Sequence, residues 1–154
     1  MKRTSLCYIE HEGSYLMLLR NKKADDPNEG KWIGIGGKFE EGETPDECML
    51  REVREETGIE LTDYHFHGII EFRSDEWEYE DMYLYTAKYP DVKREMELPE
   101  CREGTLQWIL KEDIMNLNLW EGDRVFLRAL LDGRQDINMR LGYTKDALTQ
   151  VTML

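Results

Sequence analysis

Three glutamates, Glu52, Glu55 and Glu56, lie close together in a segment that is expected to be helical. At ~100° per residue, their side chains project within roughly a 100° arc of such a helix. Glu52 and Glu56 are an i,i+4 pair of like charge, and acidic residues near a helix C-terminus also oppose the helix dipole. A bound cation relieves both problems, whereas the alternative interpretation is a solvated acidic helix face. Carboxylates without a competing thiolate or imidazole pattern indicate a hard ion, Mg²⁺ or Mn²⁺.

A glycine-rich stretch lies just before this helix and strengthens the case for a metal site. Gly34, Gly36 and Gly37 allow a bent backbone to approach the helix closely, so that an exposed carbonyl there is available as a further ligand. Lys38 provides a point charge that suits a phosphate oxygen. Magnesium commonly lies between protein carboxylates and substrate phosphates, where it neutralises charge and lowers the pKa of a bound water. Together the two stretches predict a divalent-metal site that binds the phosphates of a substrate and activates a water.

The helix that carries the glutamates has clear signals at both ends. Thr44 is a good N-cap, Pro45 suits the first helical position, and Glu47 completes a capping box with Thr44. Gly58 supplies the left-handed residue that commonly ends a helix. We therefore expect a helix over residues 44–57, with its apolar side facing the core.

The other elements needed to position this helix alternate between strands and helices. Strands are expected over 5–10, 15–20, 31–38, 64–72, 78–89 and 106–110, a short helical segment over 111–119, a helix over 123–132 and a closing hairpin within 137–154. Such a mixture is typical of a mixed sheet with helices packed on its faces, in the α/β (α+β) class. No internal repeat or low-complexity linker divides the chain, so we expect one domain over 1–154.

The composition restricts the classes of partner. The net charge of −13 argues against binding to a nucleic acid polymer, because binding to a phosphate backbone depends on Lys and Arg. No apolar run reaches the ~20 residues that cross a membrane, and the N-terminus lacks the apolar core of a signal peptide. Three widely spaced cysteines without a CxxC pair are expected to be reduced thiols. We expect a cytoplasmic protein, and the sequence leaves its oligomeric state open.

Residues 37–59 resemble the signature of the Nudix hydrolase family. That signature is Gly, five residues, Glu, seven residues, then Arg-Glu-apolar-x-Glu-Glu-x-Gly-apolar, and every specified position matches from Gly37 to Ile59. The family fold is an α/β/α sandwich with a mixed sheet, which the expected order of elements also fits. The resemblance implies hydrolysis of a nucleoside diphosphate that is linked to another moiety.

The resemblance assigns metal and catalytic roles to the clustered glutamates. Glu52 and Glu56 correspond to direct metal ligands, Glu55 to a further ligand that acts directly or through water, and the Gly36 carbonyl to a backbone ligand. The general base varies among members of the family. The resemblance therefore leaves Glu52 and Glu55 as the first candidates for the general base, with Glu103 third.

The resemblance also implies supporting roles around the helix. Arg51 and Glu43 correspond to an ion pair that holds the preceding loop to the helix and orients it. Many members of the family add an acidic metal ligand from a later loop. Glu103 is the candidate for this ligand, and the alternative is an exposed loop glutamate.

A more specific resemblance is to the MutT-like branch, whose members hydrolyse oxidised purine nucleoside triphosphates such as 8-oxo-dGTP. It rests on the segments GKWIGIGGK, GTLQW and WEGD. It implies that Trp120 stacks on a purine and that Asp123 bonds the edge of the base, with Phe72 as a second wall, whereas core packing is the alternative for Trp120. Some enzymes of the branch carry Asn where this chain has Ile33, which forms no side-chain hydrogen bond. The base preference therefore stays open.

Basic residues near the end of the second expected strand are candidates for contacts with phosphate. Arg20, Lys22 and Lys23 either meet triphosphate oxygens or are ordinary surface residues. Gly37 and Lys38 are the other candidates for substrate contacts beside the helix.

The sequence thus predicts Mg²⁺-dependent hydrolysis of nucleoside triphosphates, with Mn²⁺ as a substitute metal. The products would be a nucleoside monophosphate and pyrophosphate, in a role that removes damaged nucleotides from the precursor pool. One alternative is another nucleoside diphosphate-linked substrate, such as ADP-ribose or a dinucleoside polyphosphate. The other is a non-catalytic regulator that binds nucleotides on the same fold.

Overall fold

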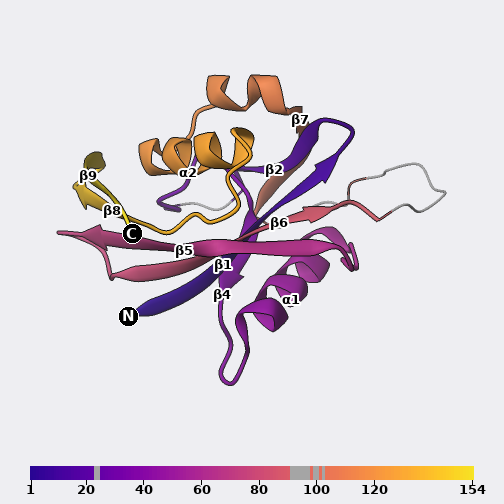
Figure 1. Ribbon diagram of the computed structural model, residues 1–154, viewed down its shortest axis with the longest axis horizontal. Helices are drawn as coiled ribbons and strands as arrows, with labels where there is room; N and C mark the ends of the chain where they lie inside the picture. Colours follow the sequence, from indigo (N-terminus) through magenta and orange to yellow (C-terminus); the bar gives the residue numbers. More distant parts are fainter. Residues whose placement is uncertain (23–24, 91–97, 99–100, 102) are drawn as a thin grey trace.

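The computed structural model describes residues 1–22, 25–90, 98, 101 and 103–154. Figure 1 shows a central sheet with α1 (Pro45–Thr57) below it and α2 (Glu121–Leu131) above it. A 3₁₀ helix, η1 (Lys111–Asn116), precedes α2. The described part of the chain also forms the strands β1 (Lys2–His11), β2 (Ser14–Arg20), β3 (Trp32–Ile33), β4 (Ile35–Lys38), β5 (Tyr64–Ser74), β6 (Glu80–Lys88), β7 (Gly104–Leu110), β8 (Met139–Thr144) and β9 (Ala147–Met153). The predicted mixed sheet with helices on its faces is confirmed.

Strand β1 lies in the interior of the sheet, where it pairs with β2, β4 and β6. The strand order is β3-β2-β1-β6-β5-β8-β9, and in addition β4 pairs with β1 and β7 pairs with β2. β1 runs parallel to β6 and antiparallel to β2 and β4. β8 runs parallel to β5, and β9 pairs antiparallel with β8, so the C-terminal hairpin extends the same sheet.

The sheet separates two apolar cores, and neighbouring residues of β1 contribute to both. Because successive side chains of a strand point to opposite faces, Cys7 packs in the cluster under α1, whereas Tyr8 packs in the cluster under α2. Val53 of α1 and Phe126 of α2 are fully buried in these two clusters. The two helices are therefore anchored to opposite faces of one strand.

Helix α1 has the ends that its sequence predicts. The Thr44 side chain accepts a hydrogen bond from the Glu47 backbone N–H, and the Glu47 carboxylate accepts one from the Thr44 N–H. Gly58 follows the helix with a φ of 75°, and its N–H donates to the Arg54 carbonyl. These local bonds fix the start and the end of the helix that carries the clustered glutamates.

The prediction of one strand over 31–38 is wrong, because the segment forms two short strands with different partners. β3 pairs with β2, whereas β4 pairs with β1. Gly34 lies between them, where a Cβ atom would be 3.0 Å from both the Cys7 carbonyl oxygen and the Tyr8 ring. The backbone therefore passes closely over β1 as it changes partner.

Helix α2 begins at Glu121, two residues before the start expected at Asp123. Trp120 is its N-cap and makes no side-chain capping bond, so the usual signal for a helix start is missing. Within the described ranges, no helix is both long and apolar enough to cross a membrane.

Candidate active site

Arg51 is the centre of an ion-pair network that joins helix α1 to the loop before it. Its guanidinium donates to both carboxylate oxygens of Glu43, at 2.7 and 3.0 Å. It also donates to Glu52 at 2.9 Å, to Glu55 at 3.1 Å and to the Lys38 carbonyl at 3.0 Å. Arg51 thereby fixes the loop after β4 and holds two of the three clustered glutamates.

Two glycines bring strand β4 against both β1 and α1. A Cβ atom on Gly36 would lie 1.9 Å from the Ser5 carbonyl oxygen, and one on Gly37 would lie 2.6 Å from the Glu52 carboxyl. Neither position has room for a side chain. The glycines therefore allow the Glu52 carboxyl to lie directly against the backbone of β4.

Glu56 has a buried carboxylate oxygen without a partner. Among the described residues, no group forms a hydrogen bond with its Oε2 atom. Burial and the neighbouring Glu103 carboxyl raise the pKa of Glu56 to about 9. Burial also raises the pKa of Glu52, and the negative charge of Glu103 adds to this effect. The three carboxyls thus lie close enough to repel one another, although Glu103 comes from a distant part of the chain.

The residues of this carboxylate group fit a hard divalent cation by their chemistry. Their donors are oxygen atoms alone, and the buried Glu56 oxygen lacks a partner within the described ranges. The described residues do not contain three His, Cys, Asp or Glu side chains already gathered into a cation cage. Glu52 and Glu55 are instead bonded to Arg51, and the Glu55 side chain is 56% exposed.

The basic residues expected to meet phosphate have different environments. Arg20 is largely buried and donates to Asp26 at 2.7 Å and to Glu103 at 3.1 Å, so it orients the Glu103 carboxylate. Lys22 donates to the Cys101 carbonyl. Lys38 is exposed. Lys23 lies outside the described residues.

A cavity of about 840 Å³ connects the region beside α1 with the region beside α2. Its lining includes a polar group made of Arg20, Gly36, Gly37, Lys38, Glu52 and Glu103, and a largely aromatic group made of Ile33, Phe72, Trp77, Trp120, Asp123 and Tyr143. Glu55 and Glu56 lie outside this lining. The cavity therefore joins acidic residues to aromatic side chains that suit a flat ring.

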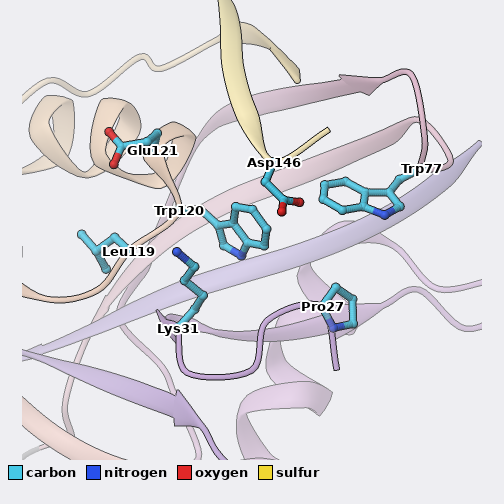
Figure 2. Close-up of a pocket in the computed structure, with 7 residues that line it drawn as sticks. All are labelled: Pro27, Lys31, Trp77, Leu119, Trp120, Glu121 and Asp146. Atoms are coloured by element: carbon cyan, nitrogen blue, oxygen red, sulfur yellow. The ribbon is translucent and has the colours of Figure 1, made fainter. Parts of the chain in front are cut away.

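Trp120 is held in place by contacts on several sides. Its Nε1 donates to the Asn28 Oδ1 at 2.8 Å, and the Lys31 Nζ lies 5.0 Å from the centre of its ring. Trp77 meets it edge to face, with ring centres 5.8 Å apart. Figure 2 shows the two indoles side by side, with the Asp146 carboxylate directed between them. Trp120 thus lines the main cavity and a neighbouring cavity of about 380 Å³.

Asp123 is a buried carboxyl in the wall of the main cavity. The residue is only 7% exposed. Burial raises its pKa to about 7, the charge of Glu80 adds to this rise, and Lys31 opposes it. Near neutral pH, Asp123 is therefore able either to donate to a ligand as the acid or to accept as the carboxylate.

This raised pKa predicts a pH-dependent difference in stability between the wild type and Asp123→Asn. Asp123 binds its proton more tightly in the folded wild type than in the unfolded chain, where the carboxyl ionises near pH 4. The folded wild type therefore loses free energy of unfolding as the pH rises from about 4 to about 7. Asparagine does not titrate, so the variant should gain up to about 4 kcal/mol relative to the wild type across that range.

Urea denaturation of both proteins at several pH values from 4 to 8 measures this difference. Asp132→Asn, at an exposed position just after the same helix, is the matched control and should show no such trend. Parallel stability curves for the wild type and Asp123→Asn would contradict the expected titration.

The residues in the cavity that the sequence did not single out come from segments far apart along the chain. Trp77 follows β5, whereas Tyr143, and Asp146 of the neighbouring cavity, belong to the C-terminal hairpin. Asn28 reaches Trp120 from the loop after β2. The parallel pairing of β5 with β8 brings the hairpin beside Trp77, and that pairing has no local signal in the sequence.

Comparisons with known proteins agree with this architecture. A family model described as the NUDIX domain matches residues 2–130. A Bacillus subtilis protein, "Uncharacterized Nudix hydrolase YvcI", is 29% identical over 153 residues, which cover 95% of this chain and 89% of that protein. The "Oxidized purine nucleoside triphosphate hydrolase" of Danio rerio is 32% identical over 117 residues, which cover 75% of this chain and 70% of the relative.

A solved structure shows the same fold. The MutT protein of Bacillus halodurans superposes with a TM-score of 0.84 at 24% identity, covering 99% of this chain and 97% of that one. Together with the matched domain, these similarities place the chain in the Nudix family, and it is a Nudix hydrolase. Hydrolases of this family act on nucleotides and generally use a divalent metal such as Mg²⁺.

Proposed function

We propose that this enzyme hydrolyses nucleoside triphosphates, with oxidised purines such as 8-oxo-dGTP as its preferred substrates. The observation that carries the proposal is the cavity that joins Glu52 and Glu103 to Trp120, Phe72 and Asp123. A nucleotide needs both of these environments, because its phosphates require charge neutralisation and its base requires a flat apolar wall. The similarity to proteins named for oxidised purine nucleoside triphosphates supports this choice of substrate.

We assign the metal-holding role to the carboxylates of Glu52, Glu55, Glu56 and Glu103, together with the Gly36 carbonyl. When bound, Mg²⁺ or Mn²⁺ would neutralise phosphate charge and lower the pKa of an attacking water. The unpartnered buried oxygen of Glu56 supports this assignment.

The remaining residues of the site position the substrate and its attacking water. Arg51 and Glu43 hold the loop and the helix together, and a carboxylate of Glu52 or Glu55, or else of Glu103, takes a proton from the water. Attack on phosphorus yields a nucleoside monophosphate and pyrophosphate. Positioning and charge neutralisation account for most of the acceleration.

Contacts with the substrate are proposed for both groups of cavity residues. Lys38, Arg20 and Lys23 serve the phosphates, and the Gly37 backbone lines the same side of the cavity. At the other side of the cavity, Trp120 and Phe72 hold the base between them and Asp123 bonds its edge. Ile33 contributes apolar contact alone, because its side chain has no hydrogen-bonding group.

The proposal is tested by kcat/KM values measured with Mg²⁺ for 8-oxo-dGTP, dGTP, the other nucleoside triphosphates and ADP-ribose. We expect 8-oxo-dGTP to exceed dGTP by at least about tenfold, the equivalent of about 1.4 kcal/mol in transition-state binding. Pyrophosphate should be the second product. Equal values for 8-oxo-dGTP and dGTP would remove the preference for oxidised purines and leave the hydrolase itself in place.

The same panel decides between the proposal and its alternatives. Faster turnover of ADP-ribose or of a dinucleoside polyphosphate would assign the enzyme to another substrate class. Binding without turnover with any of several metals would indicate a nucleotide-binding regulator.

We further propose that residues 1–154 act as one domain in the cytoplasm, in a role that removes damaged nucleotides from the pool. The continuation of the sheet through β8 and β9 supports the single domain.

A further inference from the structure

The C-terminal hairpin β8–β9 lies beyond residues 2–130, which the NUDIX domain model matches, yet it reaches the main cavity. β8 pairs with β5 in parallel, and this register places Leu141 beside Phe72. Two residues further along β8, Tyr143 lines the cavity together with Trp120 and Asp123. The hairpin therefore contributes to the wall where the base of a nucleotide is expected.

Tyr143 forms a direct bond with the first turn of α2. The backbone N–H of Gly122 donates to the Tyr143 hydroxyl oxygen over 2.7 Å, in a buried position. A Cβ atom on Gly122 would lie 2.6 Å from that oxygen, so the contact depends on glycine. Because α2 has no side-chain cap of its own, this hydroxyl satisfies one of the backbone donors that a helix start leaves free.

The ring of Tyr143 also supports Trp120. The two rings meet edge to face, with centres 5.9 Å apart. Tyr143 thus contacts Trp120, the N-cap of the helix, as well as Gly122 two residues later, and Asp123 follows Gly122 directly. One side chain from the hairpin therefore fixes the short segment that presents both the indole and the buried carboxyl.

The Tyr143 hydroxyl has a hydrogen left to donate. Its oxygen accepts from Gly122, and within the described ranges no group accepts a bond from this hydroxyl. A tyrosine hydroxyl is both a donor and an acceptor, so its hydrogen remains available to a ligand in the cavity. Purine edges carry acceptor atoms that such a donor suits.

The hairpin is held at a second point beside the cavity. The backbone N–H of Lys145 donates to the Asp75 carboxylate over 3.0 Å. Asp75 belongs to the turn after β5 that also carries Trp77. The position of Tyr143 is therefore fixed on both sides, by the pairing within the sheet and by this link between two turns.

We propose that Tyr143 is a specificity-determining residue for the base of the nucleotide, acting through the first turn of α2 and through its own hydroxyl. This inference rests on the proposed function, because it assumes that the base lies beside Trp120 and Asp123. It makes the C-terminal hairpin part of the substrate site.

The test compares Tyr143→Phe with Tyr64→Phe. The second variant is the control, because it loses the same hydroxyl group at a position away from the base. Tyr64 packs against the other core, under α1. Calorimetric titration with 8-oxo-dGMP and dGMP measures binding of the base, and titration with inorganic pyrophosphate and Mg²⁺ measures binding of phosphate alone. These ligands report affinity without any turnover, so a failure of the proposed hydrolysis does not obscure the result.

We expect Tyr143→Phe to weaken the tighter-binding purine monophosphate about tenfold, or about 1.4 kcal/mol, and to leave pyrophosphate affinity within about twofold. With a triphosphate substrate, KM should rise while kcat changes little. Gly122→Ala, which displaces the hydroxyl, should reproduce the loss of purine affinity.

Three results would overturn the inference. They are a purine affinity of Tyr143→Phe equal to that of Tyr64→Phe, an equal loss of purine and pyrophosphate affinity, or no purine binding by the wild type. Circular dichroism melting confirms that the compared variants are folded.

Discussion

Replacing Glu56 or Glu52 with glutamine should lower kcat by more than about 10²-fold while the protein stays folded. Loss of a residue that only hydrogen-bonds to a metal ligand already costs about 10- to 100-fold in activity, so loss of a direct ligand should cost at least that much. Glutamine keeps the size of the side chain. The Glu56 carboxyl has a buried oxygen that no described residue bonds, so the substitution there breaks no hydrogen bond of that oxygen. Its cost in folding free energy should therefore be small.

Steady-state turnover with Mg²⁺ and circular dichroism measure the two parts of this expectation. Addition of Mg²⁺ should raise the melting temperature of the wild type and have a much smaller effect on Glu56→Gln, because only a bound ligand stabilises the folded state. Glu41→Gln, at an exposed position in the loop before α1, is the control. Near-normal turnover in both Glu52→Gln and Glu56→Gln would refute the assignment of the metal site.

Loss of Arg51 should strongly destabilise the folded protein. Arg51→Ala leaves Glu43 and Glu52 without the guanidinium that both share, and the Arg51 side chain is only 14% exposed. We expect the free energy of unfolding to fall by about 3 kcal/mol, near the lower end for a broken buried ion pair. The free energy of unfolding of Arg51→Lys should lie between those of the wild type and Arg51→Ala, because an ammonium group keeps the charge but cannot bind Glu43 through two parallel bonds.

Urea denaturation provides the measurement, and Arg54→Ala provides a control on the same helix. Arg54 is 52% exposed and lies 3.8 Å from Glu60, so its loss should cost less than about 1 kcal/mol. Equal destabilisation by Arg51→Ala and Arg54→Ala would show that the ion pairs of Arg51 contribute no more to the free energy of unfolding than an exposed ion pair does.

The helix of the site could be predicted from the sequence because its determinants are local. Thr44 and Glu47 bond to each other across three positions, and Gly58 ends the helix by its own backbone conformation. The start of α2 has no such signal, since Trp120 makes no capping bond. Its N-terminal turn is instead bonded by Tyr143, which folding brings from another part of the sheet.

The difference between local and long-range determinants also explains why the sequence predicted one strand over 31–38 and did not indicate all the residues that line the cavity. The apolar, glycine-rich pattern gives no indication that the chain changes partner at Gly34, because that depends on the space above β1. Trp77 and Tyr143 likewise become neighbours of Trp120 through long-range pairing. Residue types and spacing therefore predicted the chemistry beside α1 more completely than the shape of the pocket beside α2.

The charge of Arg20 is neutralised locally by Asp26 and Glu103, and the whole chain has a net charge of −13. A free nucleoside triphosphate, itself an anion, approaches through a repulsive field that extends about 8 Å at physiological salt. A nucleotide that arrives already complexed with a cation meets less repulsion. Added salt should therefore speed the encounter between enzyme and free nucleotide, the reverse of what an enzyme with a basic, attracting cleft would show.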